Sequence, residues 1–513
     1  MDTNTTPQPD ERLKNVDPAE LEAYINKRLE EEHKKQDRAS ALLRLESLEV
    51  IRNLLILFVL GLFVVSPLIQ LIVRIVTDSS EKILLISSYS VKRYQWTIRN
   101  INRLARFTAV LTLLWVILFA VLRRREAKRS NIPPAEHIPL KERLGRLVPF
   151  FIFGAFVIGI IVVTKVRGAN EYDLTGHPYM YESIYSYMSY PLVYFFCGAM
   201  LYSDKMRKVI VYILLFSALP MNVLVLVSEW ITPIKYFGKT GEMPSAVFHN
   251  SNHYGYYLAI TIAAGVFMFV YEKKLWLRIA AAVSAAVAAV ALIINDTLGA
   301  YLAVAFVLIL FIVYSFFVVK KNRALSLIIF GAFILLTFLM SFKYNTVFSS
   351  IVRMTNDIGA IIADPLEADG AGSSRWKLWK GTVSHLGERP LTGFGVEGLL
   401  NTYGVGTPHN EFLQYAEFFG IPVAVLYIAA CLVILIRVLK NSKTLSPTTM
   451  ICFFVSICYL ASSFFGVAIY YTTPFVYIFL GLTYAEYLKY GKRRPADTPA
   501  EVTVPANETP AEV

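Results

Sequence analysis

The feature that most constrains this chain is a series of long apolar segments that carry almost no charge. Many of them run for roughly 18 to 25 residues, which is the length that an α-helix needs to cross a bilayer core. The composition agrees, because 55% of the 513 residues are hydrophobic and only 17% are charged. A soluble protein carries about 25% charged residues. The sequence therefore predicts an all-α polytopic membrane helix bundle and excludes a soluble enzyme.

We expect about twelve transmembrane helices from the lengths of these segments. They lie near residues 51–74, 104–122, 147–165, 186–203, 208–229, 254–271, 277–295, 298–319, 324–341, 412–438, 448–468 and 472–489. The longest polar stretch between two predicted spans is about 342–411, and we expect it to form a large loop that contains short helices.

The two ends of the chain differ from the apolar middle. Residues 1–49 are charged and favour helix, which predicts a cytoplasmic helical N-terminal segment. Residues 50–490 hold the predicted transmembrane domain. Residues 491–513 are rich in Pro, Ala and Glu, and such a tail cannot bury enough apolar surface to fold. We therefore expect a disordered cytoplasmic tail.

The net charge of +12 is distributed in a way that indicates orientation. The basic residues are scattered between spans, which argues against nucleic-acid binding. With the N-terminus in the cytoplasm, most basic loops fall inside, as the positive-inside rule requires. Segment 75–103 is an exception, because it is placed outside and still holds five basic residues: Lys82, Lys92, Arg93, Arg99 and Arg103. The distribution predicts a multi-pass cytoplasmic (inner) membrane protein with both termini inside and loop 342–411 outside.

No pattern in the sequence is typical of a metal or cofactor site. The four cysteines lie in apolar segments and form no CxxC pair. The acidic residues of the outer loop form no DxD pair, and no histidines cluster there. We therefore expect no metal and no cofactor.

The candidate chemistry lies in residues 375–423, at the end of the large outer loop. Arg375 and Trp379 open an amphipathic stretch, and His409 and Asn410 come directly before a predicted span. Asn410 is a suitable N-cap for that helix. A helix N-terminus carries partial positive charge and free N–H groups, so it attracts a diphosphate.

These residue types together fit glycosyl transfer. The helix N-terminus should lower the pKa of His409, and a neutral imidazole can accept a proton from a hydroxyl group. Arg375 can bind phosphate oxygens with its planar fork and stabilise a leaving diphosphate. Each residue also has a structural alternative: His409 as a hydrogen-bonding residue, Arg375 as a headgroup anchor, and Trp379 as an interfacial aromatic residue.

The motifs of this stretch resemble the signature of the O-antigen ligase and polysaccharide polymerase superfamily. The pattern is Arg-x-x-x-Trp, then Pro-Leu-x-Gly-x-Gly, His-Asn-x-Phe-Leu-Gln and Gly-Ile. It is carried by Arg375, Trp379, Pro390, Leu391, Gly393, Gly395, His409, Asn410, Phe412, Leu413, Gln414, Gly420 and Ile421. The predicted number of spans and the large outer loop between the ninth and tenth spans also resemble this family.

Two further segments bear on the resemblance. Asn252 lies in a segment that resembles the family's Phe-x-Asn-x-Asn motif, although an Asn-rich helix cap is an equal alternative. Leu298 stands where many members have the arginine of a Ser-Arg-Gly-Ala motif, which is held to contact the carrier diphosphate. The chain departs from the family there, so either the substrate is held differently or another cation substitutes. The candidate cations are Lys235, Lys239, Lys343 and Arg389.

The resemblance implies an inverting, metal-independent glycosyltransferase at the outer face of a bacterial cytoplasmic membrane. A glycan would move from a polyprenyl diphosphate carrier to an acceptor hydroxyl that His409 deprotonates. Arg375, Asn410 and Arg389 would bind the diphosphate. Asn252, Trp379 and Glu417 are candidate substrate contacts, and Glu417 has structural pairing inside the tenth span as its alternative.

Two other functions remain open at this point. A repeat-unit polymerase of the same superfamily would use a second carrier-linked glycan as acceptor. A transporter of lipid-linked saccharide should show internal repeats, broken helices or charges near the membrane midplane. In each case the expected partners are a polyprenyl-diphosphate-linked glycan and membrane lipid. For the enzymes, a glycan or lipid acceptor is added.

Overall fold

The computed structural model describes residues 18–78, 86–129, 139–176, 182–200, 203–232, 246–248, 251–344, 346–404 and 407–491. All regular secondary structure within these residues is helical. Lys235, Lys239 and nearly all of the predicted tail 491–513 lie outside them. The helices are α1 (Pro18–Asp78), α2 (Ile86–Arg129), α3 (Leu140–Arg167), α4 (Glu171–Thr175), α5 (Ile184–Met200), α6 (Asp204–Trp230), α7 (Ser251–Tyr271), α8 (Leu275–Asn295), α9 (Leu298–Val313) with the π-helical turn η3 (Tyr314–Val318), α10 (Arg323–Ser341), α11 (Thr346–Ala363), α12 (Arg375–Leu386), α13 (Leu400–Tyr403), α14 (Glu411–Phe419), α15 (Ile421–Lys440), α16 (Pro447–Ser463) and α17 (Thr473–Tyr490).

Nine of the described helical segments are long and apolar enough to cross a membrane. They are Leu48–Ile72, Thr97–Leu122, Leu140–Arg167, Asp204–Trp230, Ser251–Tyr271, Leu275–Asn295, Leu298–Val318, Arg323–Ser341 and Ile421–Lys440. The chain is therefore a multi-pass helical membrane protein, as the sequence predicted. The predicted count of about twelve spans is not confirmed.

The other three predicted spans are helices, but they are shorter or less apolar. They correspond to α5, α16 and α17, which have 17, 17 and 18 residues. Helix α17 packs against α5 and α16, and α16 also packs against α7 and α9. Because other helices surround them, α16 and α17 can carry buried hydroxyl groups such as those of Ser456 and Thr483.

The contacts divide the chain into two units. One unit contains residues 1–55 and 113–139, and the other contains residues 56–112 and 140–513. Helix α1 runs without a break across residue 49, where the sequence analysis placed the end of the N-terminal segment.

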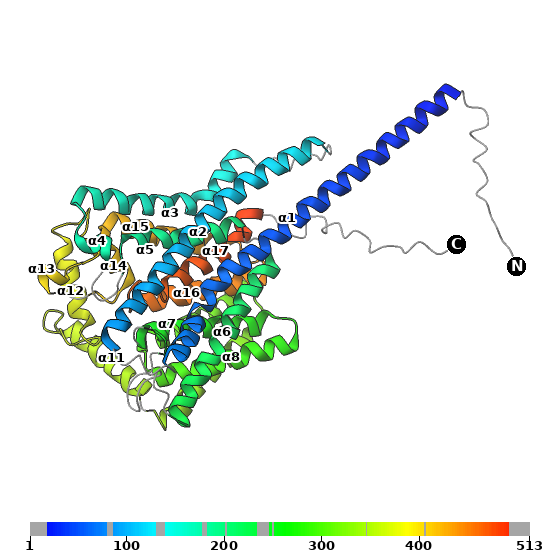
Figure 1. Cartoon of the computed structure of the whole chain (residues 1–513). Coiled ribbons are helices and arrows are strands. Elements are labelled where there is room, and N and C mark those ends of the chain that lie inside the picture. The colour runs from blue at the N-terminus through cyan, green and yellow to red at the C-terminus, as the bar shows by residue number, and fades with distance from the viewer. Residues whose placement is uncertain are drawn as a thin grey trace. The chain divides into compact units, whose positions relative to one another are not determined.

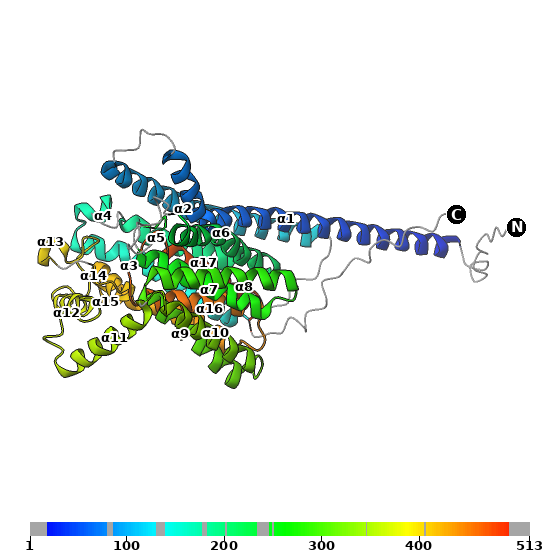
Figure 2. The same cartoon turned by 90° about the horizontal axis from the view of Figure 1, so that it is seen from below.

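The larger unit holds the candidate site. Within it, α7 packs against α8 and α16, and α15 packs against α3 (Figure 1). Helices α4, α11, α12, α13 and α14 gather at one end of this unit in both views (Figures 1 and 2). The short helices predicted for the large outer loop are α11, α12 and α13.

The predicted tenth span, 412–438, is interrupted in the structure. Gly420 has φ +86° and separates α14 from α15. A Cβ atom at this position would lie 2.3 Å from the carbonyl oxygen of Leu391, so the close approach of the two chain segments requires glycine. The candidate span is Ile421–Lys440, and Glu417 therefore lies before it rather than inside it. This corrects the expectation of a charge within the tenth span.

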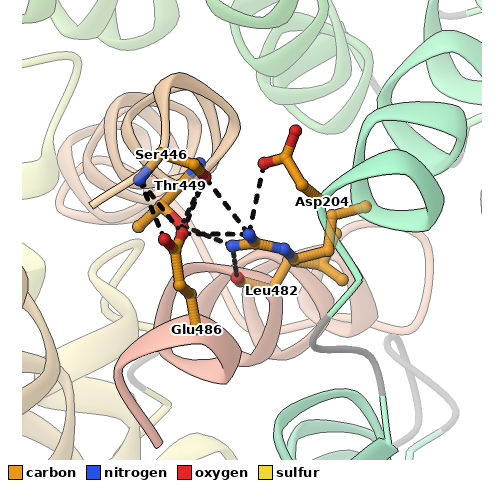
Figure 3. Close-up of polar contacts among 6 residues, drawn as sticks. Asp204, Ser446, Thr449, Leu482 and Glu486 are labelled. Atoms are coloured by element: carbon orange, nitrogen blue, oxygen red, sulfur yellow. Dashed lines mark hydrogen bonds and ion pairs between the residues drawn. The ribbon is translucent and has the colours of Figure 1, made fainter. Parts of the chain in front are cut away.

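A buried arginine fastens three helices elsewhere in the larger unit. Arg207 of α6 is 1% exposed and forms an ion pair of 3.0 Å with Glu486 of α17. It also donates hydrogen bonds to the hydroxyls of Thr449 and Ser446 and to the carbonyl of Leu482 (Figure 3). Glu486 accepts further hydrogen bonds from Ser446 and Thr449. The charges of this Arg207 cluster are thus satisfied by the protein itself.

Candidate functional site

Several predicted residues meet at a cavity of about 470 Å³, which we call the small cavity. Its wall is formed by the first turn of α7, the turn between α8 and α9, one face of α11 and the start of α12. Arg375, Asn252, Trp379 and Leu298 all line it. The structure thus brings together three of the candidate site residues and the position where the family arginine is missing.

Arg375 is placed by a tight turn directly before α12. Ser373 and Ser374 have φ values of +56° and +65°, and Gly372 has +62°. The carboxylate of Asp357 on α11 accepts a hydrogen bond of 2.9 Å from the Gly372 N–H and so holds this turn. Arg375 Nη1 donates to the Gly372 carbonyl at 3.2 Å, and its buried Nε has no partner within the described residues. The guanidinium therefore keeps unused donor capacity at the cavity.

His409 lies on the chain segment that enters α14. It is half-buried and has φ +49°, a conformation that non-glycine residues rarely adopt. Trp379 Nε1 donates a hydrogen bond of 2.8 Å to the carbonyl of Pro408, which ties α12 to this segment. Asn410 is the N-cap of α14, because its side-chain oxygen accepts from the N–H groups of Phe412 and Leu413. This confirms the predicted cap.

The electrostatic environment keeps the His409 imidazole neutral at pH 7. Burial is the largest cause that lowers the pKa of His409, and the positive charge of Arg375 is the second; together they bring this pKa to about 4. We had expected the N-terminus of α14 to be the cause, so the direction agrees and the dominant cause differs. His409 itself does not line the small cavity, but it is close enough to Arg375 for the two groups to interact.

A second, larger cavity of about 1100 Å³ shares two tryptophans with the small cavity. Trp376 and Trp379 line both cavities. Asn410, the neighbour of His409, lines only the larger one. Apolar side chains of α14, α15 and the end of α16 also line it, namely Phe412, Leu413, Ile428 and Phe464. His409 therefore directly precedes a residue that lines the larger cavity and follows Pro408, whose carbonyl is bonded by a tryptophan that lines both cavities.

The starts of α7 and α9 are joined at the wall of the small cavity. Asn295 Nδ2 and Thr297 Oγ1 both donate to the carbonyl of Ser251, each at 3.2 Å. This contact places the half-buried Asn252 beside Leu298 on one wall. The predicted position of Asn252 at the site is thus consistent with the structure, and its contact with a substrate stays a prediction.

The Pro-Leu-x-Gly-x-Gly motif has a structural role. Phe394 N–H donates to the Glu417 carbonyl at 2.7 Å, and Gly395 N–H donates to the Phe418 carbonyl at 3.0 Å. Gly393 has φ +62°, and a Cβ atom there would lie 2.6 Å from backbone atoms of α14 and Gly420. The glycines therefore let this loop lie directly against α14, the helix that follows His409.

Glu417 holds the same loop. Its side chain is 1% exposed, and Oε1 accepts a hydrogen bond of 2.8 Å from the Leu399 N–H. Burial raises the pKa of Glu417 to about 8. Glu417 lines neither cavity, and its buried Oε2 has no partner among the described residues, so its role as a substrate contact stays a prediction. Arg167 and Asp173, which the sequence analysis did not single out, form an ion pair that also bonds to this loop.

Two of the candidate replacement cations do not reach either cavity. Arg389 is exposed and lies over the Phe394 ring at 5.3 Å. Lys343 lies over the Trp230 ring at 5.6 Å. Neither lines the small or the larger cavity. In the part of the chain that the structure describes, no group of three or more His, Cys, Asp or Glu side chains is placed to hold a metal ion.

Sequence reasoning missed Arg353 and Asp357, which also line the small cavity. Their spacing of four residues in an amphipathic segment was the available signal, because it places them on one face of a helix.

A comparison with protein families adds independent support for the resemblance. Residues 283–428 match the family model described as O-antigen ligase. The match includes Leu298, Arg375, His409 and Glu417, whereas Asn252 precedes it. A comparison with curated proteins gave no match. The family implies a membrane glycosyltransferase of the ligase or polymerase kind, with a lipid-linked glycan and an acceptor as partners. The motifs thus indicated the family whose model matches: residues 283–428, which hold Arg375 and His409, are similar to the O-antigen ligases.

Proposed function

We propose that this protein moves a glycan from a polyprenyl diphosphate carrier to an acceptor hydroxyl at the outer face of a bacterial cytoplasmic membrane. The observation that carries this proposal is the pairing of Arg375, which has unused donors at a cavity, with a neutral imidazole at His409. One group binds and stabilises an anion, and the other accepts a proton. These are the two tasks of a glycosyl transfer with a diphosphate leaving group.

The diphosphate would lie in the small cavity against Arg375. A guanidinium binds phosphate oxygens with two parallel N–H bonds, and such charge-assisted bonds are about twice as strong as neutral ones. Negative charge grows on the diphosphate as its bond to the sugar breaks. A cation that is already held in place stabilises this charge without reorganisation.

His409 would act as the base toward the acceptor hydroxyl. The acceptor oxygen attacks the anomeric carbon, its proton passes to the imidazole, and the bond to the diphosphate oxygen breaks. The charge of Arg375 lowers the pKa of His409 in the free protein. A bound diphosphate would offset that charge, so donor binding should raise the basicity of His409 just before the transfer.

The larger cavity offers a route for the acceptor. Inversion requires the acceptor oxygen and the leaving diphosphate to lie on opposite sides of the anomeric carbon. Asn410 lines the larger cavity and Arg375 lines the small one, and Trp379 lies between them. An acceptor that enters from the side of Asn410 would therefore meet His409 opposite the diphosphate.

The order of the spans supports the outer face as the location. Helix α10 is a candidate span with Lys320, Lys321 and Arg323 at its start, and α11 and α12 follow its end. Helix α15 is a candidate span that begins after α14 and ends near Arg437 and Lys440. Basic loops stay in the cytoplasm, which would leave α11, α12 and α14 outside and the termini inside.

The direct test is transfer by purified protein in liposomes that contain a polyprenyl-diphosphate-linked glycan and candidate acceptors. His409→Ala should lower the rate by about 10²–10⁴-fold, the usual contribution of a general base. His33→Ala, which changes an exposed histidine of α1, is the matched control and should retain the wild-type rate. Full transfer by His409→Ala would end the proposed base role.

The products of the same assay separate ligase from polymerase. A single addition of the complete glycan supports a ligase. A ladder of repeat units on the carrier supports the polymerase of the same superfamily.

A further inference from the structure

One face of α11 forms a wall of the small cavity. The residues of this face are spaced by three and four along the helix, and they are Ser350, Arg353, Met354, Asp357, Ile358 and Ile361. This spacing places them on one side of an α-helix. The opposite side of α11 carries the exposed apolar side chain of Val352. The two charged residues of α11, Arg353 and Asp357, therefore both belong to its cavity face.

The two charged residues of this face differ in what they bind. Asp357 accepts the Gly372 N–H and thereby fixes the turn before Arg375. Arg353 has no ion pair within the described residues, and its side chain is exposed. Asp357 joins α11 to the turn before α12. Arg353 of α11 and Arg375 of α12 therefore both line the small cavity.

The charge of a glycosyl diphosphate exceeds what one arginine supplies. Each of its two phosphate groups carries one negative charge, and their mutual repulsion is strongest where water is excluded. Among the described residues that line the small cavity, the cations are Arg353 and Arg375, and the carboxylates are Asp296 and Asp357. The α9 side of the wall is apolar at Leu298. A second cation for this ligand can thus come from α11 but not from α9.

We propose that Arg353 is the second diphosphate-binding cation of this site and, with Arg375, grips the carrier diphosphate from two sides of the small cavity. This inference rests on the proposed function, because the ligand is the donor of that reaction. It assigns to α11, a helix outside the spans, the charge that many family members place at the position of Leu298. Lys343 and Arg389 are then not needed for this task.

Kinetics of the Arg353 variants test the proposal. Arg353→Gln should lower kcat/KM for the lipid-linked donor by at least about tenfold, because it removes a charge-assisted contact to the diphosphate. Arg353→Lys should retain more activity than Arg353→Gln, since it keeps the charge. Arg323→Gln, an exposed arginine at the start of α10, should behave as the wild type. Wild-type kinetics of Arg353→Gln would overturn the inference.

A relocation of the charge gives a sharper test. Leu298 lines the same cavity, so Leu298→Arg should restore part of the activity of Arg353→Gln. A general loss of folding would not be rescued in this way. If the double variant is as impaired as Arg353→Gln alone, the cavity does not need a second positive charge, and the inference is wrong.

A binding measurement separates this inference from the proposed function. The probe is polyprenyl diphosphate without a glycan, bound to the purified protein in detergent. Weaker binding by Arg353→Gln, by about tenfold, supports the inference even if no glycan is transferred. Equal binding by Arg353→Gln and wild type overturns the inference even if the wild type is an active transferase. Absence of binding by the wild type overturns both proposals.

Discussion

Two arginines in the larger unit show how the same side chain serves different ends. Arg207 is surrounded by partners from α16 and α17, and its charge meets Glu486 at 3.0 Å. Arg375 donates to the Gly372 carbonyl, forms no ion pair with a carboxylate among the described residues, and borders a cavity of about 470 Å³. Both are largely withdrawn from water, but only one is neutralised by the protein.

The difference follows from the cost of burying charge. A buried guanidinium that lacks a carboxylate is unfavourable, and proteins keep such groups mainly at functional sites. In the Arg207 cluster, Glu486 and the hydroxyl groups of α16 offset the desolvation of the guanidinium, and the same contacts join three helices. At Arg375 the proposed diphosphate ligand would supply the missing partner. Substitution of Arg207 should therefore mainly lower stability, whereas substitution of Arg375 should mainly lower transfer activity.

The largest effect is expected on stability at the Arg207 cluster. Arg207→Gln leaves Glu486 buried without its cation, which should destabilise the fold by about 3–5 kcal/mol. All four cysteines are buried, so a thiol-reactive dye can report unfolding on heating. The midpoint should fall clearly below that of the wild type, while Arg323→Gln should leave it unchanged. An unaltered midpoint in Arg207→Gln would show that the cluster does not fasten the helices.

The next largest effect is expected on catalysis at the small cavity. Arg375→Gln should reduce transfer by about 10²–10³-fold, because it removes a preorganised positive charge from the leaving group. Arg375→Lys should also be impaired, since a point charge does not replace a planar fork. Both variants should keep the wild-type unfolding midpoint. If the midpoint fell as in Arg207→Gln and the activity per folded molecule did not change, Arg375 would be a structural residue.

The smallest effect concerns pH and follows from the burial of His409 and, second, from the nearby charge of Arg375. His409 has a pKa of about 4 in the free protein, so the imidazole stays neutral from about pH 8 down to pH 6. The value of kcat/KM should be nearly constant over that range and fall only at lower pH. In Arg375→Gln the residual activity should begin to fall at a higher pH, because the charge that lowers the pKa of His409 is gone. A wild-type profile that already falls near pH 6.5 would contradict the lowered pKa of His409, and an unshifted profile in Arg375→Gln would contradict the coupling of the two groups.

Local features of the sequence predicted a large part of this structure. The helical class and most spans follow from apolar segments, because a backbone in lipid must bond within its own helix. The Asn410 cap is equally local, since its oxygen bonds only two and three residues ahead. The motif around Arg375 and His409 indicated the family over residues 283–428.

Other features depend on segments that are distant in the sequence. Helices α16 and α17 carry buried hydroxyls because other helices surround them, and hydropathy alone cannot show this. The break at Gly420 exists because Leu391 approaches it closely. The place of Glu417 outside the cavities depends on its bond to Leu399.

The sequence by itself determined that this chain crosses a membrane many times and that Arg375 and His409 lie in a stretch that matches the O-antigen ligase family model. These properties depend on each residue and its near neighbours. Only the tertiary structure decided which groups share a cavity: it placed Arg353 of α11 beside Arg375 and left Arg389 outside. A cavity is formed by side chains that long-range packing brings together, so its composition cannot be obtained from spacing along the chain.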